Sequence, residues 1–244
     1  RVDVLMLSKI SGDAAVGWYG AAHKIIDAYS LFPILLVISL FPVLIKVHKE
    51  NKDSLESVSN KVLKYLLIIG IPLIIFSLVD AKKIILFLYN EEFTNSIPVF
   101  QLLSIRGMTF FSSNVLLGYL LFTTDKEKLY LKLVVITLCL NIFLNFILIP
   151  KYSYIGASLA TAISGIFSSF LHYRYVSRFV CKIKVLSYSI KPLISSIFII
   201  GIILLLKANL FWDIIIVIIM YPLLLKILKT FTIEDKQILR SIIR

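Results

Sequence analysis

The apolar positions of the chain fall into long runs, and short charged connections separate these runs. A membrane-spanning helix needs roughly 20 mostly apolar residues, and seven segments approach or exceed that length. They cover residues 25–45, 62–79, 97–122, 131–149, 155–176, 189–206 and 210–228, and residues 1–10 form the tail of an eighth. This pattern predicts an all-α integral membrane protein, a polytopic bundle of about eight helices.

The composition excludes a water-soluble fold. Hydrophobic residues make up 59% of the 244 residues and charged residues only 16%, whereas soluble domains carry about 25% charged residues. The formal net charge of +12 does not indicate nucleic acid as a partner, because Lys and Arg lie between the apolar runs and not in a basic stripe with interleaved aromatic residues. Membrane lipids are therefore the expected surroundings of most of the surface.

The basic residues are divided unequally between the two alternating sets of connections, with 18 in one set and 5 in the other. Short cytoplasmic loops carry the excess of Lys and Arg. The rich set comprises Lys46, Lys49, Lys52, Lys61, Lys64, Lys126, Lys128, Lys132, Arg174, Arg178, Lys182, Lys184, Lys191, Lys226, Lys229, Lys236, Arg240 and Arg244, and the poor set comprises Lys9, Lys82, Lys83, Lys151 and Lys207. We therefore expect a protein of the cytoplasmic (inner) membrane with a cytoplasmic C-terminus.

Two segments are too short or too charged to span a bilayer. Residues 82–93 are predicted to form an amphipathic turn on the outer surface, and residues 231–244 a short amphipathic helix on the inner surface. The chain contains no glycine-rich phosphate loop, metal-ligand cluster or nucleophile elbow. The sequence thus predicts neither an enzyme nor a cofactor or metal site.

Arg106 lies about ten residues into the segment 97–122, where a charge costs at least ~2.5 kcal/mol and normally faces a protein or water-filled interior. Thr109 and Ser113 follow at i+3 and i+7, so the three side chains share a helical face. We interpret Arg106 as a substrate-binding candidate, because its guanidinium can bind a phosphate or carboxylate in a bidentate manner. The alternative is structural, an ion pair with another helix or a side chain that reaches the interface.

Lys24 and Asp27 lie three residues apart at the outer start of their helix, so they share a face and are able to pair with each other. Both are substrate-binding candidates at the outer mouth of a cavity. An interfacial ion pair that only anchors the helix is the interpretation that we favour.

Thr137, Asn141 and Asn145 recur every four residues and give the segment 131–149 a polar stripe. Such side chains commonly form hydrogen bonds between helices, at about 1 kcal/mol each, and this interpretation is favoured over substrate binding by Asn141 and Asn145. The following segment carries Gly156, Ala160, Ser164 and Ser168 at the same interval, a small-residue face that predicts close helix packing.

Several strings carry a family resemblance. They are residues 3–7 (DVLML), residues 16–22 (VGWYGAA), the pair Phe41–Pro42 and, most specifically, residues 141–164 (NIFLNFILIPKYSYIGASLATAIS). They resemble the second half of the polysaccharide or O-antigen flippases, the Wzx-type branch of the multidrug/oligosaccharidyl-lipid/polysaccharide exporter superfamily. The usual glycine of that family after the Pro-Lys-Tyr turn is Ser153 here.

The resemblance implies the C-terminal lobe of a two-lobed transporter of 12 to 14 helices that works by alternating access. Residues 1–180 would form this lobe, with the end of one span and five complete spans, residues 181–230 two additional spans, and residues 231–244 a cytoplasmic tail. The chain is then expected to be the C-terminal part of a longer protein whose N-terminal lobe is missing. The implied cargo is an undecaprenyl-pyrophosphate-linked oligosaccharide for surface polysaccharide assembly, and a polysaccharide polymerase is a possible partner.

Other functions stay open at this point. A drug/cation antiporter of the same superfamily would use buried acids for ion coupling, and Asp27 and Asp213 lie near the ends of their spans. A membrane polysaccharide polymerase or glycosyltransferase would need a large outer loop, and the longest outer connection has only about 17 residues, from Asp80 to Ser96. A non-transporting structural subunit is the third alternative.

Overall fold

The structure is a computed structural model that describes residues 2–109 and 115–231. Five helices in this part of the chain are long and apolar enough to cross a membrane, all or most of α1, α2, α6, α7 and α8. The elements are α1 (Val2–Glu50), α2 (Lys52–Val79), α3 (Ala81–Tyr89), the 3-10 helix η1 (Glu91–Phe93), α4 (Ser96–Thr109), α5 (Val115–Thr123), α6 (Glu127–Phe179), α7 (Val185–Leu206) and α8 (Leu210–Ile227). The predicted all-helical membrane fold is confirmed.

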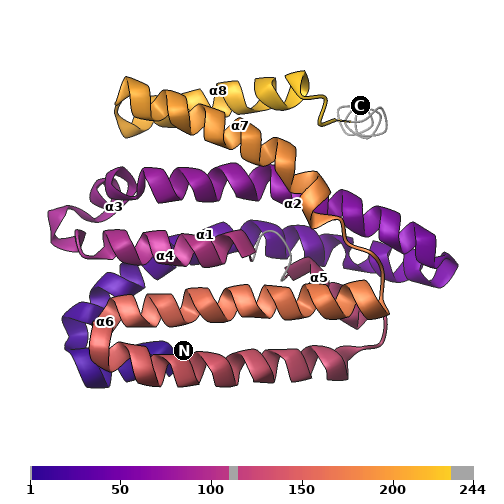
Figure 1. The fold of residues 1–244 in the computed structure, drawn as a ribbon, viewed down its shortest axis with the longest axis horizontal. Coiled ribbons are helices and arrows are strands. Elements are labelled where there is room, and N and C mark those ends of the chain that lie inside the picture. Colours follow the sequence, from indigo (N-terminus) through magenta and orange to yellow (C-terminus); the bar gives the residue numbers. More distant parts are fainter. Residues whose placement is uncertain (1, 110–114, 232–244) are drawn as a thin grey trace.

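Helices α1 and α6 are each interrupted by one residue with non-helical backbone angles. In α6 this residue is Ser153, with φ 51° and ψ −130°, and Figure 1 shows the two arms of α6 lying side by side on either side of this turn. The arms contain the predicted spans 131–149 and 155–176. In α1 the interruption is Gly12, with φ 80° and ψ 177°, a conformation that essentially only glycine adopts.

The predicted span 97–122 is described as two short helices, α4 and α5. Each is shorter than the roughly 20 residues that cross a bilayer. Residues 110–114, which connect them, lie outside the described residues, and so does Ser113 of the predicted polar face. The segment 82–93 forms the short helix α3 and the helix η1.

The apolar cores lie between α1, α2, α4, α5 and both arms of α6. Helix α7 packs along α2, and α8 packs against α7, so that these two helices form an outer layer of the bundle (Figure 1). The hydroxyl of Tyr221 in α8 donates a hydrogen bond of 2.6 Å to the carbonyl oxygen of Ile68 in α2. Residues 232–244, which contain the predicted amphipathic tail, lie outside the described residues.

The connections gather at two opposite ends of the bundle (Figure 1). At one end lie the α1–α2, α5–α6 and α6–α7 connections and the C-terminal end of α8. These parts and the adjoining helix ends carry those members of the lysine-rich and arginine-rich set that belong to the described residues. We call it the basic end. The α2–α4 connection, the turn of α6 and the α7–α8 connection lie at the opposite end, so the alternation inferred from the charges agrees with the path of the chain.

A cluster of three charges ties α8 to this opposite end. Lys83 of α3 forms an ion pair with Asp80 at 2.9 Å and donates a hydrogen bond to Asp213 of α8, whose side chain is fully buried. Partial burial lowers the pKa of the Lys83 ammonium, but the hydrogen bonds and negative charges of Asp213 and Asp80 outweigh this effect and raise its pKa above the usual value. The stabilisation is therefore present at neutral pH and is lost only as pH rises through the raised pKa of the lysine.

We expect Lys83→Ala to lower the stability of the protein by about 2 kcal/mol, because it leaves the buried carboxylate of Asp213 without its cation. The destabilisation is no larger because the Lys83 side chain is 36% exposed, so solvent screens part of its attraction to Asp213. Thermal unfolding in detergent measures the change, and Lys82→Ala is the matched control, since Lys82 is the adjacent exposed lysine. Equal unfolding temperatures for the two variants would contradict the assignment.

Candidate functional site

The bundle contains a cavity of about 970 Å³ between α1, α4, α5 and both arms of α6. Among the residues described as lining it, Arg106 is the one Lys or Arg, and Asp3 and Asp27 are the acids. The remaining lining is mixed, with hydroxyl, amide and imidazole groups beside aromatic and aliphatic side chains. A membrane bundle thus gathers a cation, two acids and several hydrogen-bonding groups around one space.

Arg106 enters this cavity from α4 across the second arm of α6. The contact depends on Gly165, because a Cβ atom at that position would lie 2.8 Å from Cγ of Arg106, closer than such atoms normally approach. Gly165 is buried, whereas Arg106 is partly exposed. The small residue therefore provides the space in which the arginine side chain lies. Of its predicted companions, Thr109 has no described side-chain position.

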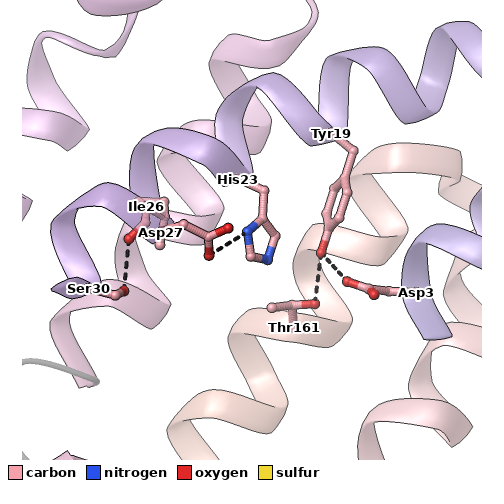
Figure 2. A network of polar contacts seen from close by, with 7 residues as sticks. All are labelled: Asp3, Tyr19, His23, Ile26, Asp27, Ser30 and Thr161. Carbon is pink, nitrogen blue, oxygen red and sulfur yellow. Dashed lines mark hydrogen bonds and ion pairs between the residues drawn. The ribbon is translucent and has the colours of Figure 1, made fainter. Parts of the chain in front are cut away.

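A hydrogen-bonded group connects the start of α1 with the rest of the bundle (Figure 2). The hydroxyl of Tyr19 donates to Oδ2 of Asp3 at 2.5 Å, and its oxygen lies 3.3 Å from Oγ1 of Thr161 in α6. Tyr19 is fully buried, and Asp3 is 9% exposed. Since Gly12 separates Asp3 from Tyr19, this contact holds the segment before the interruption against the cavity wall.

Asp27 contacts His23, one helical turn before it. Nδ1 of His23 lies 3.1 Å from Oδ1 of Asp27, and both residues line the cavity, as Figure 2 shows for their facing side chains. Lys24 is exposed and does not line the cavity. Residues at i+3 and i+4 share a helical face almost equally well, and the rotation of α1 turns the histidine inward.

The asparagine stripe forms a hydrogen-bond chain between the two arms of α6. Nδ2 of Asn145 donates to Oδ1 of Asn141 at 2.9 Å, and Nδ2 of Asn141 donates to Oγ of Ser164 at 3.0 Å. Asn141 lines the cavity, whereas Asn145 is fully buried and does not. Hydrogen bonding between helical segments, the favoured interpretation, is what these contacts show. Asn141 also remains available at the cavity wall.

The sequence interpretation missed several parts of this site. His23 and His172 line the cavity from α1 and α6, and no pattern in the sequence distinguishes them from ordinary buried histidines. The small-residue face was assigned to packing alone, but Ser164 and Ser168 also border the cavity. The four-residue spacing of small and hydroxyl residues opposite an intramembrane arginine is the signal that points to them.

A helical membrane bundle around a cavity with a cation and many hydrogen-bonding groups has the architecture of a membrane transport protein. The comparisons agree with this class and narrow it. The sequence model described as "Lipid II flippase MurJ" matches residues 10–226. The chain belongs to this flippase family, whose members are transporters, within the exporter superfamily that the resemblance indicated. The matching family model is that of MurJ and does not identify the narrower Wzx-type branch.

Two curated relatives and one solved structure are similar to this chain. The chain is 28% identical over 181 residues to the probable low-salt glycan biosynthesis flippase Agl15 of Haloferax volcanii. The aligned stretch covers 73% of this chain and 38% of that protein. The chain is 26% identical over 175 residues to the capsular polysaccharide biosynthesis protein CapF of Staphylococcus aureus. Here the aligned stretch covers 71% of this chain and 44% of that protein. The chain therefore spans less than half the length of these curated relatives.

The solved structure shows a shared fold. The lipid II flippase MurJ in an inward closed conformation superposes with a TM-score of 0.72 at 19% identity, over 99% of this chain and 53% of that chain. At this identity the match concerns the fold alone. The arrangement of the helices described above is thus that of about half of a known flippase structure.

Proposed function

We propose that the protein takes part in moving a lipid-linked oligosaccharide across the membrane, and that the cavity described above forms one wall of the path. The single observation that carries this proposal is Arg106, a permanent cation that lines a cavity of mixed polar and apolar character in a membrane bundle. A pyrophosphate that crosses a region of low dielectric constant needs such a partner, because an unpaired charge there is costly. The names of the two curated relatives, a glycan flippase and a capsular polysaccharide protein, support the same class of cargo.

The finer assignment of the proposal is an undecaprenyl-pyrophosphate-linked oligosaccharide for surface polysaccharide assembly, as in the Wzx-type flippases. Arg106 binds the headgroup phosphates, Asn141 offers its amide to the sugar, and the His23–Asp27 pair borders the path. Alternating access against the other lobe of a two-lobed transporter moves the cargo, and no covalent step is needed. A polysaccharide polymerase is the proposed protein partner on the far side of the membrane.

The orientation follows from the charge distribution. We place the basic end in the cytoplasm, because short cytoplasmic loops carry the excess of Lys and Arg. The C-terminal end of α8 then lies on the cytoplasmic side of the inner membrane, and the cargo moves from the inner to the outer leaflet.

Reconstitution of the complete gene product in lipid vesicles tests the proposal. A fluorescent polyprenyl-pyrophosphate oligosaccharide is placed in the vesicles, and a membrane-impermeant quencher reports how fast the label changes leaflet. We expect the labelled lipid to change leaflet much faster than in vesicles without protein. Deletion of the gene in its host should lower the amount of surface glycan, and expression of the protein should restore it. A protein that is folded and correctly inserted but leaves the leaflet distribution unchanged would overturn the proposal.

One observation keeps a second function in view, the drug/cation antiporter. Asp3 and Asp27 both line the cavity, although only Asp3 is nearly buried and Asp27 is exposed, and acids within the membrane are what ion-coupled antiporters use. The same vesicles distinguish the two functions. Dye or cation counterflow without movement of the labelled lipid would favour the antiporter.

A further inference from the structure

A second cavity, of about 390 Å³, lies at the basic end between the first turns of α2 and the start of α7. Its lining residues are Glu56, Ser57, Asn60, Lys61, Lys184 and Tyr188. All six carry a hydrogen-bonding group, and two of them are lysines. The large cavity has none of these residues in its lining, so the two sites are separate.

Asn60 gives this cavity a fixed frame. The side chain is 4% exposed, donates a hydrogen bond of 2.9 Å to the carbonyl oxygen of Lys182, and accepts one of 2.8 Å from the backbone N–H of Lys184. Oε2 of Glu56 accepts a further hydrogen bond of 3.2 Å from the backbone N–H of Lys182. The chain that enters α7 is thereby held against α2, and the lysine at its N-cap position is placed beside the cavity.

The electrostatics of the cavity favour an anion. Lys61 and Lys184 are its cations, and Glu56 is the acid in its lining. One oxygen of that acid already accepts the Lys182 N–H, which satisfies part of its charge. The start of α7 adds the partial positive charge of a helix N-terminus. Two lysines, a tyrosine and a serine hydroxyl around one space offer the donors that a phosphate group requires.

The neighbouring surface is suited to acyl chains. The exposed residues Leu186, Ile190, Ile194, Ile197 and Phe198 follow each other along one face of α7, in a helix that qualifies as a membrane span. Tyr188 lies in the first turn of this helix, at the level where amphipathic rings favour the membrane–water interface. This apolar surface begins at Leu186, which lies along the chain between the two cavity-lining residues Lys184 and Tyr188.

We propose that this cavity binds the phosphate-bearing headgroup of an anionic phospholipid of the leaflet at the basic end, with its acyl chains along α7. The lipid is a bound component of the bundle and not the transported cargo, because the cargo-binding groups lie in the other cavity. Its phosphate bridges Lys61 of α2 and Lys184 of α7, so it fastens the outer layer of the bundle to α2. Basic pockets between helices at a membrane surface are known to bind such headgroups.

Native mass spectrometry of the detergent-solubilised protein tests the assignment, with phosphatidylglycerol as the probe and phosphatidylcholine as the neutral reference. We expect the wild-type protein to retain phosphatidylglycerol preferentially. The pair Lys61→Gln and Lys184→Gln should weaken this retention roughly thirtyfold, on the basis of about one kcal/mol for each lysine. The control pair Lys49→Gln and Lys182→Gln removes the same charge from exposed lysines outside the cavity lining and should retain the lipid.

A variant of unchanged charge separates a site from general attraction. Ser57→Trp fills the cavity from an exposed position in α2 and should also abolish the preference, while its unfolding temperature stays near that of the wild type. Equal losses in the two lysine pairs would overturn the proposal in favour of general surface charge. Displacement of the lipid by inorganic phosphate, beyond that by chloride at equal ionic strength, would overturn the lipid assignment and indicate a site for free phosphate.

Discussion

Gly156→Ala should leave little folded protein in the membrane. The Cβ atom of alanine would lie 2.2 Å from the carbonyl oxygen of Leu148 and 2.5 Å from its carbonyl carbon, and these are backbone atoms of the opposite arm of α6. Neither arm can yield without opening the turn at Ser153, so the expected cost exceeds the roughly 3 kcal/mol of ordinary overpacking. The yield of monodisperse protein after solubilisation and its unfolding temperature measure the effect.

The matched control is Gly201→Ala. Gly201 lies in α7, and a Cβ atom there meets no other atom within 4 Å, so this alanine should be neutral or slightly favourable through its helix propensity. If Gly156→Ala gave the same yield and unfolding temperature as Gly201→Ala, the close contact between the arms of α6 would be disproved.

Arg106→Ala should lower transport by about 10- to 100-fold with the amount of protein unchanged, since a hydrogen bond to a charged group contributes about 1.5–3 kcal/mol. Arg106→Lys keeps the charge but loses the bidentate geometry, and is expected to give an intermediate rate. The leaflet-exchange measurement on vesicles, or surface polysaccharide in the host, reports the effect. Unchanged transport at equal protein levels would remove Arg106 from the mechanism.

Gly165→Ala tests the position of the arginine separately from its charge. The added Cβ would lie 2.8 Å from Cγ of Arg106, which belongs to a flexible side chain, so the fold should persist while the guanidinium moves. We expect about tenfold slower transport with a near-normal unfolding temperature, because a displacement of about 1 Å is costly for a binding group. Gly17→Ala, with nothing within 4 Å of its Cβ, is the control. Wild-type transport in Gly165→Ala would contradict the positioning role.

The spans were predictable because hydrophobic length is a local property of the sequence. The turn of α6 was predictable as well, because the spans 131–149 and 155–176 leave only residues 150–154 between them. What the residue types do not signal is the φ of 51° at Ser153, since a positive φ favours glycine, the usual residue of the family at this position. Similarly, nothing in the run from Gly12 onward signals that the helix continues to Glu50. Small residues such as Ala14 and Ala15 are compatible with a connection as well as with a helix.

The residues of the site also differ in how far the sequence predicted them. Arg106 was predictable because a single arginine in an apolar run has few structural explanations, and the structure places it in the cavity. The contacts of Tyr19 were not, because its partners Asp3 and Thr161 lie 16 and 142 residues away from it along the chain. The contact between His23 and Asp27 depends on the rotation of α1, which tertiary packing sets.

The turn at Ser153 also determines which parts of the opposite end a protease or an antibody can reach. The two arms of α6 reverse direction around a single non-helical residue, Ser153, so the turn offers little connecting chain for an inserted cleavage site or epitope. The α2–α4 connection is different, because Asn90, Glu91 and Glu92 are exposed and tips of this kind accept insertions. Topology mapping of this end of the protein is therefore best directed at residues 90–92.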